Sequence, residues 1–232
     1  MKHLPFSLII FTLFISPLEH ISAQDWAELK HFEKANQSVG AAKPNEQRII
    51  LMGNSITIGW LQIHPEFFKG KPYINRGISG QTTPQMLLRF RSDVVALQPT
   101  IVVILAGTND IAGNTGPTTL ERIMDNIRSM TEIAQANNIK VVLCSVLPAF
   151  DYPWKPGMKP HIKIPALNAK IAAYAREKEV YYLDYFTALE DGNKGMKTAY
   201  ASDGVHPTLE GYKVMESLLE KAIATLTTNK KE

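Results

Sequence analysis

The sequence predicts an α/β fold in which a five-stranded parallel sheet carries helices on both faces. Short apolar runs rich in β-branched residues alternate with longer amphipathic stretches, which is the pattern of βαβ units. The chain has 232 residues, of which 45% are hydrophobic and 20% charged, and these values favour a single globular domain. We therefore expect a single domain whose helices cover both faces of one sheet.

Each predicted strand is a short apolar run that ends at turn-forming residues. The expected strands are Arg48 to Met52, Tyr73 to Ile78, Thr100 to Ala106, Lys140 to Leu147 and Val180 to Tyr185. Helices are expected where apolar residues recur at three- and four-residue steps. The expected helices are Pro84 to Leu97, Thr118 to Asn137, Pro165 to Glu179 and Thr208 to Leu226.

Two further helical segments are predicted near the start of the chain. Asp25 to Gln37 has apolar residues at near-helical spacing and ends before a break from Gly40 to Asn45. Ser55 to Phe68 is expected to be partly helical, with its length limited by Gly59 and Pro65.

Residues 1–23 have the pattern of a signal peptide. Lys2 and His3 precede an apolar run from Leu4 to Ile15, and the segment ends in small residues at Ser22 and Ala23. The run is too short and too poorly flanked for a membrane span, although a retained membrane anchor is the alternative. We expect an exported protein, periplasmic or secreted, with residues 24–232 as a single domain and no stable membrane insertion after signal removal.

Charge and cysteine content exclude several classes of function. The formal net charge is +3, and both signs are mixed along the chain, so a nucleic-acid partner is not expected. Cys144 is the only cysteine and lies in an apolar run, which excludes an internal disulfide and favours a buried strand residue. The chain has no His-Glu-x-x-His motif and its six histidines are scattered, so no metal site is predicted.

Polar residues follow the predicted strands where a parallel sheet places its ligand site, beyond the carboxyl ends. These segments are Gly53-Asn54-Ser55, Gly77-Ile78-Ser79-Gly80, Gly107-Thr108-Asn109-Asp110 and Asp203-Gly204-Val205-His206. The topology predicts that all four lie at one edge of the sheet.

Ser55, His206 and Asp203 have the chemistry of a nucleophile, its base and the group that orients the base. A serine hydroxyl needs a base to take its proton, and the unperturbed pKa of histidine lies nearest to neutrality. A carboxylate must then hold the imidazole in the correct tautomer, and Asp203 can reach His206 locally. Pro207 restricts His206 to an extended conformation.

Acyl transfer also needs donors for the oxyanion, and three are predicted: the backbone N–H groups of Ser55 and Gly80 and the side-chain amide of Asn109. Each residue alone also fits a purely structural role as a helix cap or turn former. Asp110 is equally consistent with holding its own turn and is not included in the catalytic set. The prediction of a catalytic site therefore rests on the order in which the four segments occur together.

The four segments resemble the conserved blocks of the SGNH hydrolases, also called the GDSL-like lipase/esterase family. The resemblance runs from Gly53 to His206 and includes the Gly-x-Asn-Asp block at Gly107–Asp110 and the Asp-x-x-His-Pro run at Asp203–Pro207. It implies a flavodoxin-like three-layer α/β/α sandwich and no cofactor. It also implies Ser55 as nucleophile, Gly80 and Asn109 as oxyanion donors, and Asp203 with His206 as the rest of the triad.

Asn54 departs from the usual family motif, and Thr57 argues against a second hydrolase fold. The usual Gly-Asp-Ser reads Gly-Asn-Ser here, with Asn54 in place of the acid, which bears on the fine structure of the turn and not on activity. Thr57 stands where the nucleophile elbow of α/β-hydrolases has its second glycine, so that fold is disfavoured.

The resemblance implies a small-molecule or glycan ester as substrate, with acetyl groups on carbohydrates favoured. The loop from Pro148 to Lys163 should overhang the same edge and carries Phe150, Tyr152 and Trp154, which either stack on a sugar ring or cover the core. The alternatives are a lysophospholipase or platelet-activating-factor acetylhydrolase-like esterase and, in another class, a non-catalytic carbohydrate-binding protein on a hydrolase scaffold.

Overall fold

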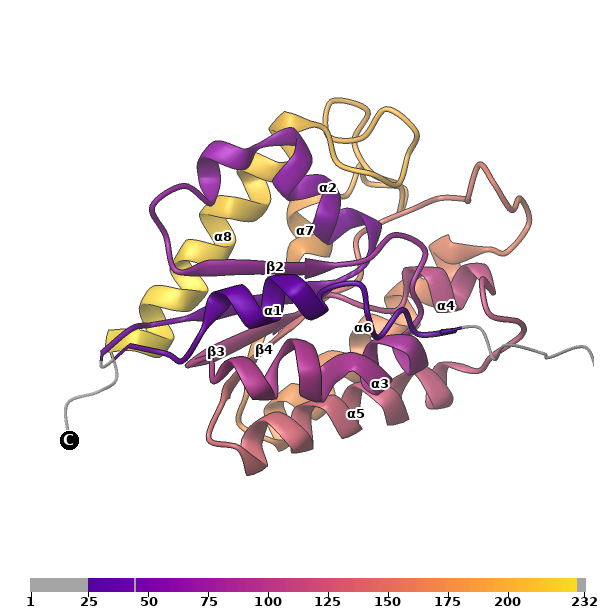
Figure 1. The fold of residues 1–232 in the computed structure, drawn as a ribbon. Coiled ribbons are helices and arrows are strands. Elements are labelled where there is room, and N and C mark those ends of the chain that lie inside the picture. Colours follow the sequence, from indigo (N-terminus) through magenta and orange to yellow (C-terminus); the bar gives the residue numbers. More distant parts are fainter. Residues whose placement is uncertain (1–24, 44, 229–232) are drawn as a thin grey trace, which may run out of the picture.

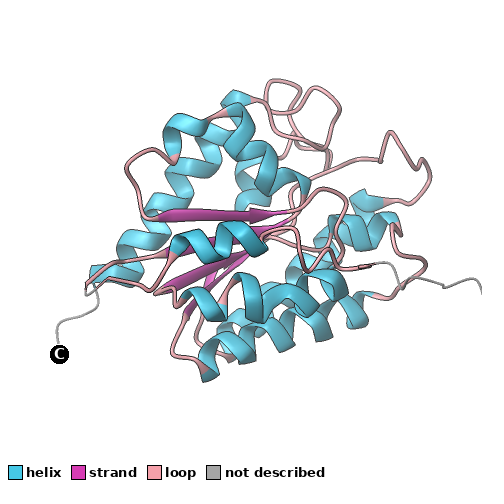
Figure 2. Ribbon diagram, in the orientation of Figure 1, coloured by secondary structure: helices cyan, strands magenta, loops and turns pink. Residues whose placement is uncertain are grey.

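The computed structural model describes residues 25–43 and 45–228, which form a three-layer α/β/α sandwich (Figures 1 and 2). The predicted signal peptide lies outside these residues. The sheet has five parallel strands in the order β2-β1-β3-β4-β5. This is the strand order of flavodoxin-like doubly wound sheets, so the predicted fold class is confirmed.

All five predicted strands are present. They are β1 (Ile49–Gly53), β2 (Tyr73–Gly77), β3 (Ile101–Ile104), β4 (Lys140–Cys144) and β5 (Tyr181–Leu183). Strands β3 and β4 end earlier than predicted. The apolar runs that predicted them continue past the last residues that pair with a neighbouring strand. Ala106 is 3% exposed and Leu147 is 2% exposed, yet both lie in loops at the carboxyl edge. Burial at this edge therefore extends into the segments that form the site.

Side chains of each central strand alternate between two cores, which explains their continuous apolar sequence. In β1, Ile50 and Met52 face α3 (Thr83–Asp93), α5 (Leu120–Ala136) and α6 (Pro160–Glu177). Ile49 and Leu51 face the other core, which is formed by α2 (Ser55–Ile63), α7 (Tyr185–Leu189) and α8 (Leu209–Thr228). The sheet is thus buried on both faces, as predicted.

The short helices account for the remaining differences from the predicted elements. They are α1 (Glu33–Val39), α4 (Thr108–Ala112), and the 3-10 helices η1 (Pro65–Phe67) and η2 (Val95–Leu97). The predicted helix from residue 25 begins only at Glu33, because Asp25 accepts hydrogen bonds from the backbone N–H groups of Glu28 and Lys30 and holds a turn instead. Tyr185 opens α7 where strand was predicted, because Asp184 caps that helix through Thr187 N.

Helix α6 begins five residues earlier than predicted, at Pro160 and not at Pro165. Proline commonly occupies the first turn of a helix, and the chain offers two candidates for that position. Pro165 lies inside α6, at the cost of one backbone hydrogen bond.

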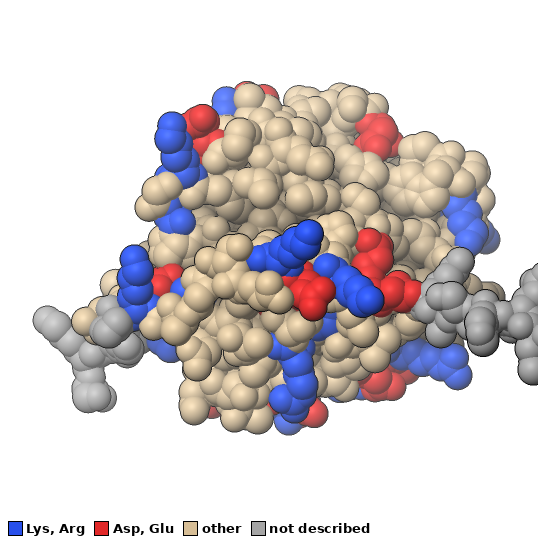
Figure 3. Space-filling view, in the orientation of Figure 1, with Lys and Arg blue, Asp and Glu red and all other residues tan. Residues whose placement is uncertain are grey.

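The surface carries no extended region of one charge in the view of Figure 3, where Lys and Arg lie among Asp and Glu. This agrees with the mixed charges of the sequence. None of the described helices is both long enough and apolar enough to cross a membrane.

Candidate active site

Ser55 is the first residue of α2, and only Asn54 separates it from the carboxyl end of β1. Asn54 is the N-cap, 1% exposed, and its Oδ1 accepts a hydrogen bond from Ile56 N at 3.2 Å. An N-cap asparagine performs this role as well as aspartate, which explains how the chain tolerates Asn54 in this turn. Ser55 is therefore not the cap, and its hydroxyl is free for another partner.

Two glycines allow the turn at Ser55 to pack tightly. A Cβ atom on Gly77, at the end of β2, would lie 2.4 Å from Ile58 N and 2.8 Å from Asn54 O. A Cβ atom on Gly53 would lie 1.9 Å from Thr57 Oγ1. Both positions exclude any side chain because the ends of β1 and β2 approach the first turn of α2 so closely.

Ser55, His206 and Asp203 lie in one line of hydrogen bonds. Ser55 Oγ lies 3.0 Å from His206 Nε2, although the two residues are 151 positions apart in the sequence. His206 Nδ1 lies 2.6 Å from Asp203 Oδ2. This arrangement fits a neutral imidazole that donates from Nδ1 and accepts from the serine hydroxyl at Nε2.

Asp203 and His206 lie in the irregular segment between α7 and α8, which is held by local bonds. Asp203 Oδ1 accepts from Val205 N at 2.9 Å and from His206 N at 2.7 Å, and Ala201 pairs with Pro207 across the segment. Partial burial acts to raise the pKa of Asp203, but the hydrogen bonds from His206 and the backbone outweigh it and hold the pKa below its ordinary value. Asp203 therefore remains a carboxylate at neutral pH.

Of the two predicted oxyanion residues other than Ser55, one lies in a loop and one in α4, and hydrogen bonds tie the two segments together. Gly80 has φ +77°, a left-handed conformation that favours glycine, and its carbonyl accepts from Asn114 Nδ2 at 3.1 Å. Asn109, in α4, is 3% exposed, and its Nδ2 donates to Gln81 O at 2.9 Å. A primary amide has two hydrogens, and this bond uses only one of them.

Arg89 in α3 joins these loops, and sequence reasoning missed it. The side chain is 0% exposed, and its Nη2 donates to Gly53 O at 3.0 Å and to Arg76 O at 2.9 Å. Its Nε donates to Gln81 Oε1 at 2.6 Å, and its Nη1 pairs with Asp93 Oδ2 at 2.9 Å. One guanidinium thus fixes the end of β1 before Ser55 and the residue after Gly80. No local signal marks an arginine on an amphipathic helix as buried.

Asp110, which was not placed in the catalytic set, is buried and holds the start of α3. Its carboxylate accepts from Thr83 N at 3.0 Å and from Thr83 Oγ1 at 2.5 Å. Burial raises the pKa of Asp110 above its ordinary value, although the hydrogen bonds from Thr83 oppose the shift. Asp110 therefore links α4 to α3 and not only its own turn.

The loop between β4 and α6 divides its aromatic residues between core and surface. Tyr152 is 0% exposed and its hydroxyl lies 2.9 Å from Thr108 Oγ1, so it covers the core. Phe150 is 50% exposed and Trp154 is 44% exposed. The Trp154 ring lies 5.8 Å from the His206 ring, so this loop and the segment before α8 meet beyond one end of the sheet (Figure 1).

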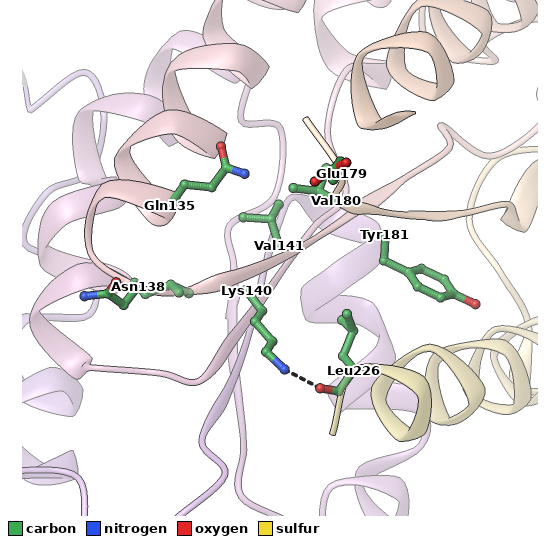
Figure 4. Close-up of a pocket in the computed structure, with 9 residues that line it drawn as sticks. Gln135, Asn138, Lys140, Val141, Glu179, Val180, Tyr181 and Leu226 are labelled. Carbon is green, nitrogen blue, oxygen red and sulfur yellow. Dashed lines mark hydrogen bonds between the residues drawn. The ribbon is translucent and has the colours of Figure 1, made fainter. Parts of the chain in front are cut away.

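A pocket of about 470 Å³ lies at the opposite end of the sheet, beside the amino ends of β4 and β5 (Figure 4). Lys140, Tyr181 and Leu226 contribute to its lining, and the Lys140 ammonium donates to the Leu226 carbonyl. In the described part of the chain, no group of three or more His, Cys, Asp or Glu residues is placed to hold a metal ion. Ser55, His206 and Asp203 do not line this pocket.

The sequence matches a family model over the whole segment that contains this geometry. The model of the GDSL-like Lipase/Acylhydrolase family matches residues 51–214. The chain belongs to this family. The predicted resemblance is thus confirmed, and the protein is a carboxylic ester hydrolase.

Three relatives support the assignment. A structure assigned as an acylhydrolase from Bacteroides fragilis is 48% identical, covers 88% of this chain and 99% of its own, and superposes with a TM-score of 0.85. Esterase TesA of Pseudomonas aeruginosa is 28% identical over 78% of this chain and 88% of its own length. An acetylxylan esterase of Xylanibacter ruminicola is 26% identical over 81% of this chain, but the match spans only 45% of that esterase.

Proposed function

We propose that this esterase uses Ser55 as nucleophile, His206 as general base and Asp203 as orienting carboxylate to remove acetyl groups from carbohydrates. The hydrogen-bonded line from Ser55 Oγ through the His206 ring to Asp203 Oδ2 is the observation that carries the proposal. These are the contacts that activate a serine hydroxyl in acyl transfer.

In the first half of the reaction, Ser55 Oγ attacks the ester carbonyl carbon while its proton moves to His206 Nε2. Asp203 stabilises the resulting imidazolium and holds its orientation through Nδ1–H. The electron pair of the carbonyl moves to its oxygen, which accepts hydrogen bonds from the backbone N–H groups of Ser55 and Gly80 and from the Asn109 amide. As the first residue of α2, Ser55 has an N–H with no acceptor inside the helix.

The tetrahedral intermediate collapses when His206 gives its proton to the leaving alcohol oxygen, which leaves an acetyl ester on Ser55. Water then enters, loses a proton to His206 and attacks the acetyl carbonyl. Breakdown of the second intermediate returns the proton to Ser55 Oγ and releases acetate.

Two observations favour a carbohydrate as the alcohol part of the ester. The half-exposed Trp154 ring lies beside His206, where the leaving group departs, and an aromatic face provides a surface for the apolar face of a sugar ring. The relative from Xylanibacter ruminicola is an acetylxylan esterase. We also propose that residues 1–23 direct export and that residues 24–232 form one domain.

The assignment of the nucleophile is tested with Ser55→Ala and p-nitrophenyl acetate. Turnover should fall by at least about 10⁴-fold, because the remaining groups cannot form an acyl-enzyme. Ser217→Ala, at an exposed serine on α8, is the control and should leave turnover and fluorophosphonate labelling intact. Wild-type labelling of Ser55→Ala would refute the assignment.

The substrate is tested by measuring acetate release from acetylated xylo-oligosaccharides and from 2-acetyl lysophospholipids. We expect Trp154→Ala to lower kcat/KM for the oligosaccharides and to leave p-nitrophenyl acetate hydrolysis near wild type, because only the sugar contacts the ring. Higher kcat/KM for the lipid than for every sugar ester would overturn the carbohydrate assignment and leave the triad assignment intact.

A further inference from the structure

A second pocket lies beside the loop that carries Gly80 and the α4 segment that carries Asn109, and the mechanism above does not use it. Its volume is about 330 Å³. Trp26 and Pro84 supply apolar surface, while Asp110, Thr115, Arg122 and Asn126 supply polar groups. A concave site with one aromatic surface and several converging polar groups is the usual form of a small-ligand site.

Hydrogen bonds hold the backbone at Trp26, while its ring is half-exposed. The side chain is 49% exposed, but its carbonyl accepts from Gln85 Nε2 at 2.6 Å, and the carbonyl of Ala27 accepts from Gln81 Nε2 at 2.9 Å. Gln85 is itself held in the capping box of α3, where its Oε1 accepts from Thr82 N at 3.0 Å. Burial of a large apolar ring is favourable, so a half-exposed tryptophan on a pinned backbone favours a ligand with a flat apolar face.

The polar groups of this pocket match a ligand with hydroxyl groups. Asn126 Nδ2 donates to Thr83 Oγ1 at 3.0 Å, which leaves Oδ1 as an acceptor. Arg122 supplies donors, the Thr115 hydroxyl can donate or accept, and the Asp125 carboxylate accepts. Donors and acceptors of both kinds beside an aromatic ring fit a sugar, in which hydroxyl groups surround an apolar ring face.

The pocket wall is continuous with the predicted oxyanion loops. Asn114 Nδ2 bonds Gly80 O at 3.1 Å, and the next residue, Thr115, places Oγ1 at 3.0 Å from Thr82 Oγ1. Asp110, in the pocket, directly follows Asn109 in α4. A ligand in this pocket and an ester at Ser55 would therefore contact the same short segments from two sides.

We infer that this pocket is a subsite for one sugar residue of a glycan whose acetyl ester reacts at Ser55, with Trp26 as its stacking surface. The inference rests on the proposed carbohydrate substrate. On this inference, Trp26 makes the enzyme prefer longer glycans. Trp26 lies at the Gly80 side of the site, whereas Trp154 lies at the His206 side.

The test compares Trp26→Ala with Leu29→Ala. Leu29 is 48% exposed and belongs to the same segment but does not line the pocket, so it is a matched control. For acetylated xylohexaose, Trp26→Ala should raise KM about 5- to 10-fold, the scale of one lost aromatic contact, and Trp26→Phe should restore most of the loss. Acetylated xylobiose and p-nitrophenyl acetate should react as with wild type.

The outcomes separate this inference from the proposed function. Equal effects of Trp26→Ala and Leu29→Ala, or equal losses on xylobiose and xylohexaose, would overturn the subsite and leave the deacetylase assignment standing. If no acetylated sugar is hydrolysed, the proposed substrate fails, and calorimetric titration of Ser55→Ala with xylohexaose and cellohexaose decides on the pocket. Binding that Trp26→Ala abolishes would support the subsite, and absence of binding would overturn it.

Discussion

The two halves of the candidate active site are built in different ways. Asn109 is 3% exposed and Arg89 0% exposed, and bonds from several elements hold the loops around Ser55. Asp203 and His206 have side chains that are each 40% exposed, and their bonds come mainly from residues within the same turn. Substitutions should therefore lower activity and stability together in the buried half, and lower activity alone in the exposed half.

The largest effect in the exposed half is expected for Asp203→Asn. An amide NH₂ facing His206 Nδ1 would favour the wrong imidazole tautomer, so kcat should fall by about 10³- to 10⁴-fold. The melting temperature should change little, because Asn Oδ1 can still accept from Val205 N and His206 N. Kinetics on p-nitrophenyl acetate and thermal unfolding measure the two quantities.

Asp191→Asn is the matched control for this prediction. Asp191 lies in the same irregular stretch, and its Oδ1 accepts from Asn193 N at 2.7 Å and Gly195 N at 3.0 Å, much as Asp203 does in its own turn. This variant should keep its activity. Similar losses of kcat in the two variants would show that Asp203 acts only by holding the loop.

In the buried half, Asn109→Ala should lower both activity and stability. Loss of one oxyanion donor costs on the order of 100-fold in kcat. The same substitution leaves Gln81 O without its donor, which costs about 1–3 kcal/mol of unfolding free energy for a buried acceptor. Steady-state kinetics and urea unfolding give the two values.

Asn168→Ala separates the two effects of Asn109→Ala. Asn168 is 6% exposed and bonds both the N–H and the carbonyl of Val146, so its removal should destabilise the fold at least as much. Its kcat should remain within about 3-fold of wild type, because it donates nothing to the ester. A comparable fall in kcat would mean that Asn109 acts through stability alone.

The strands and the positions of the site residues could be predicted because their signals are local. Apolar runs marked every strand, and the Ser55, Gly80 and Asn109 segments follow strands whose parallel arrangement brings their ends together. Spacing alone also placed Asp203 within reach of His206. The 3.0 Å contact between His206 and Ser55 depends on the packing of α8 against α2, which no local pattern contains.

The parts that escaped prediction depend on tertiary contacts. Arg89 occupies a helical position whose burial depends on the carbonyls of Gly53 and Arg76, contributed by two different strands. The pocket at Trp26 likewise needs α3, α5 and the start of the described chain to meet. Polar side chains in such networks look like surface residues until their partners are known.

Arg89→Lys tests whether this buried network positions the site, with an expected loss of about 10-fold in kcat. A lysine ammonium cannot replace the fork that bonds Gln81, Gly53 and Asp93 together, so the loops of Ser55 and Gly80 should lose their relative alignment. KM for p-nitrophenyl acetate should change less than kcat. Unfolding free energy should fall by about 3 kcal/mol, as for other broken buried pairs.

Asp93→Asn breaks the same ion pair from the other side and serves as the control. It leaves the bonds from Arg89 to Gln81 and Gly53 in place, so stability should fall while kcat stays near wild type. Equal ratios of lost kcat to lost stability in the two variants would contradict a positioning role for Arg89.

The smallest expected effect concerns Asp110, whose pKa is shifted in the opposite direction to that of Asp203. Burial raises the pKa of Asp110 in the folded state, so its contribution to stability is full below the ordinary value of 3.8 and is lost as pH rises through the folded value. Asp110→Asn should remove this decline, and the slope of unfolding free energy against pH above 3.8 should become more positive than in wild type. Asp203→Asn should instead alter the slope below 3.8, because the folded pKa of Asp203 is lowered. Parallel stability curves for wild type and Asp110→Asn across this range would show that Thr83 compensates fully for the burial of Asp110.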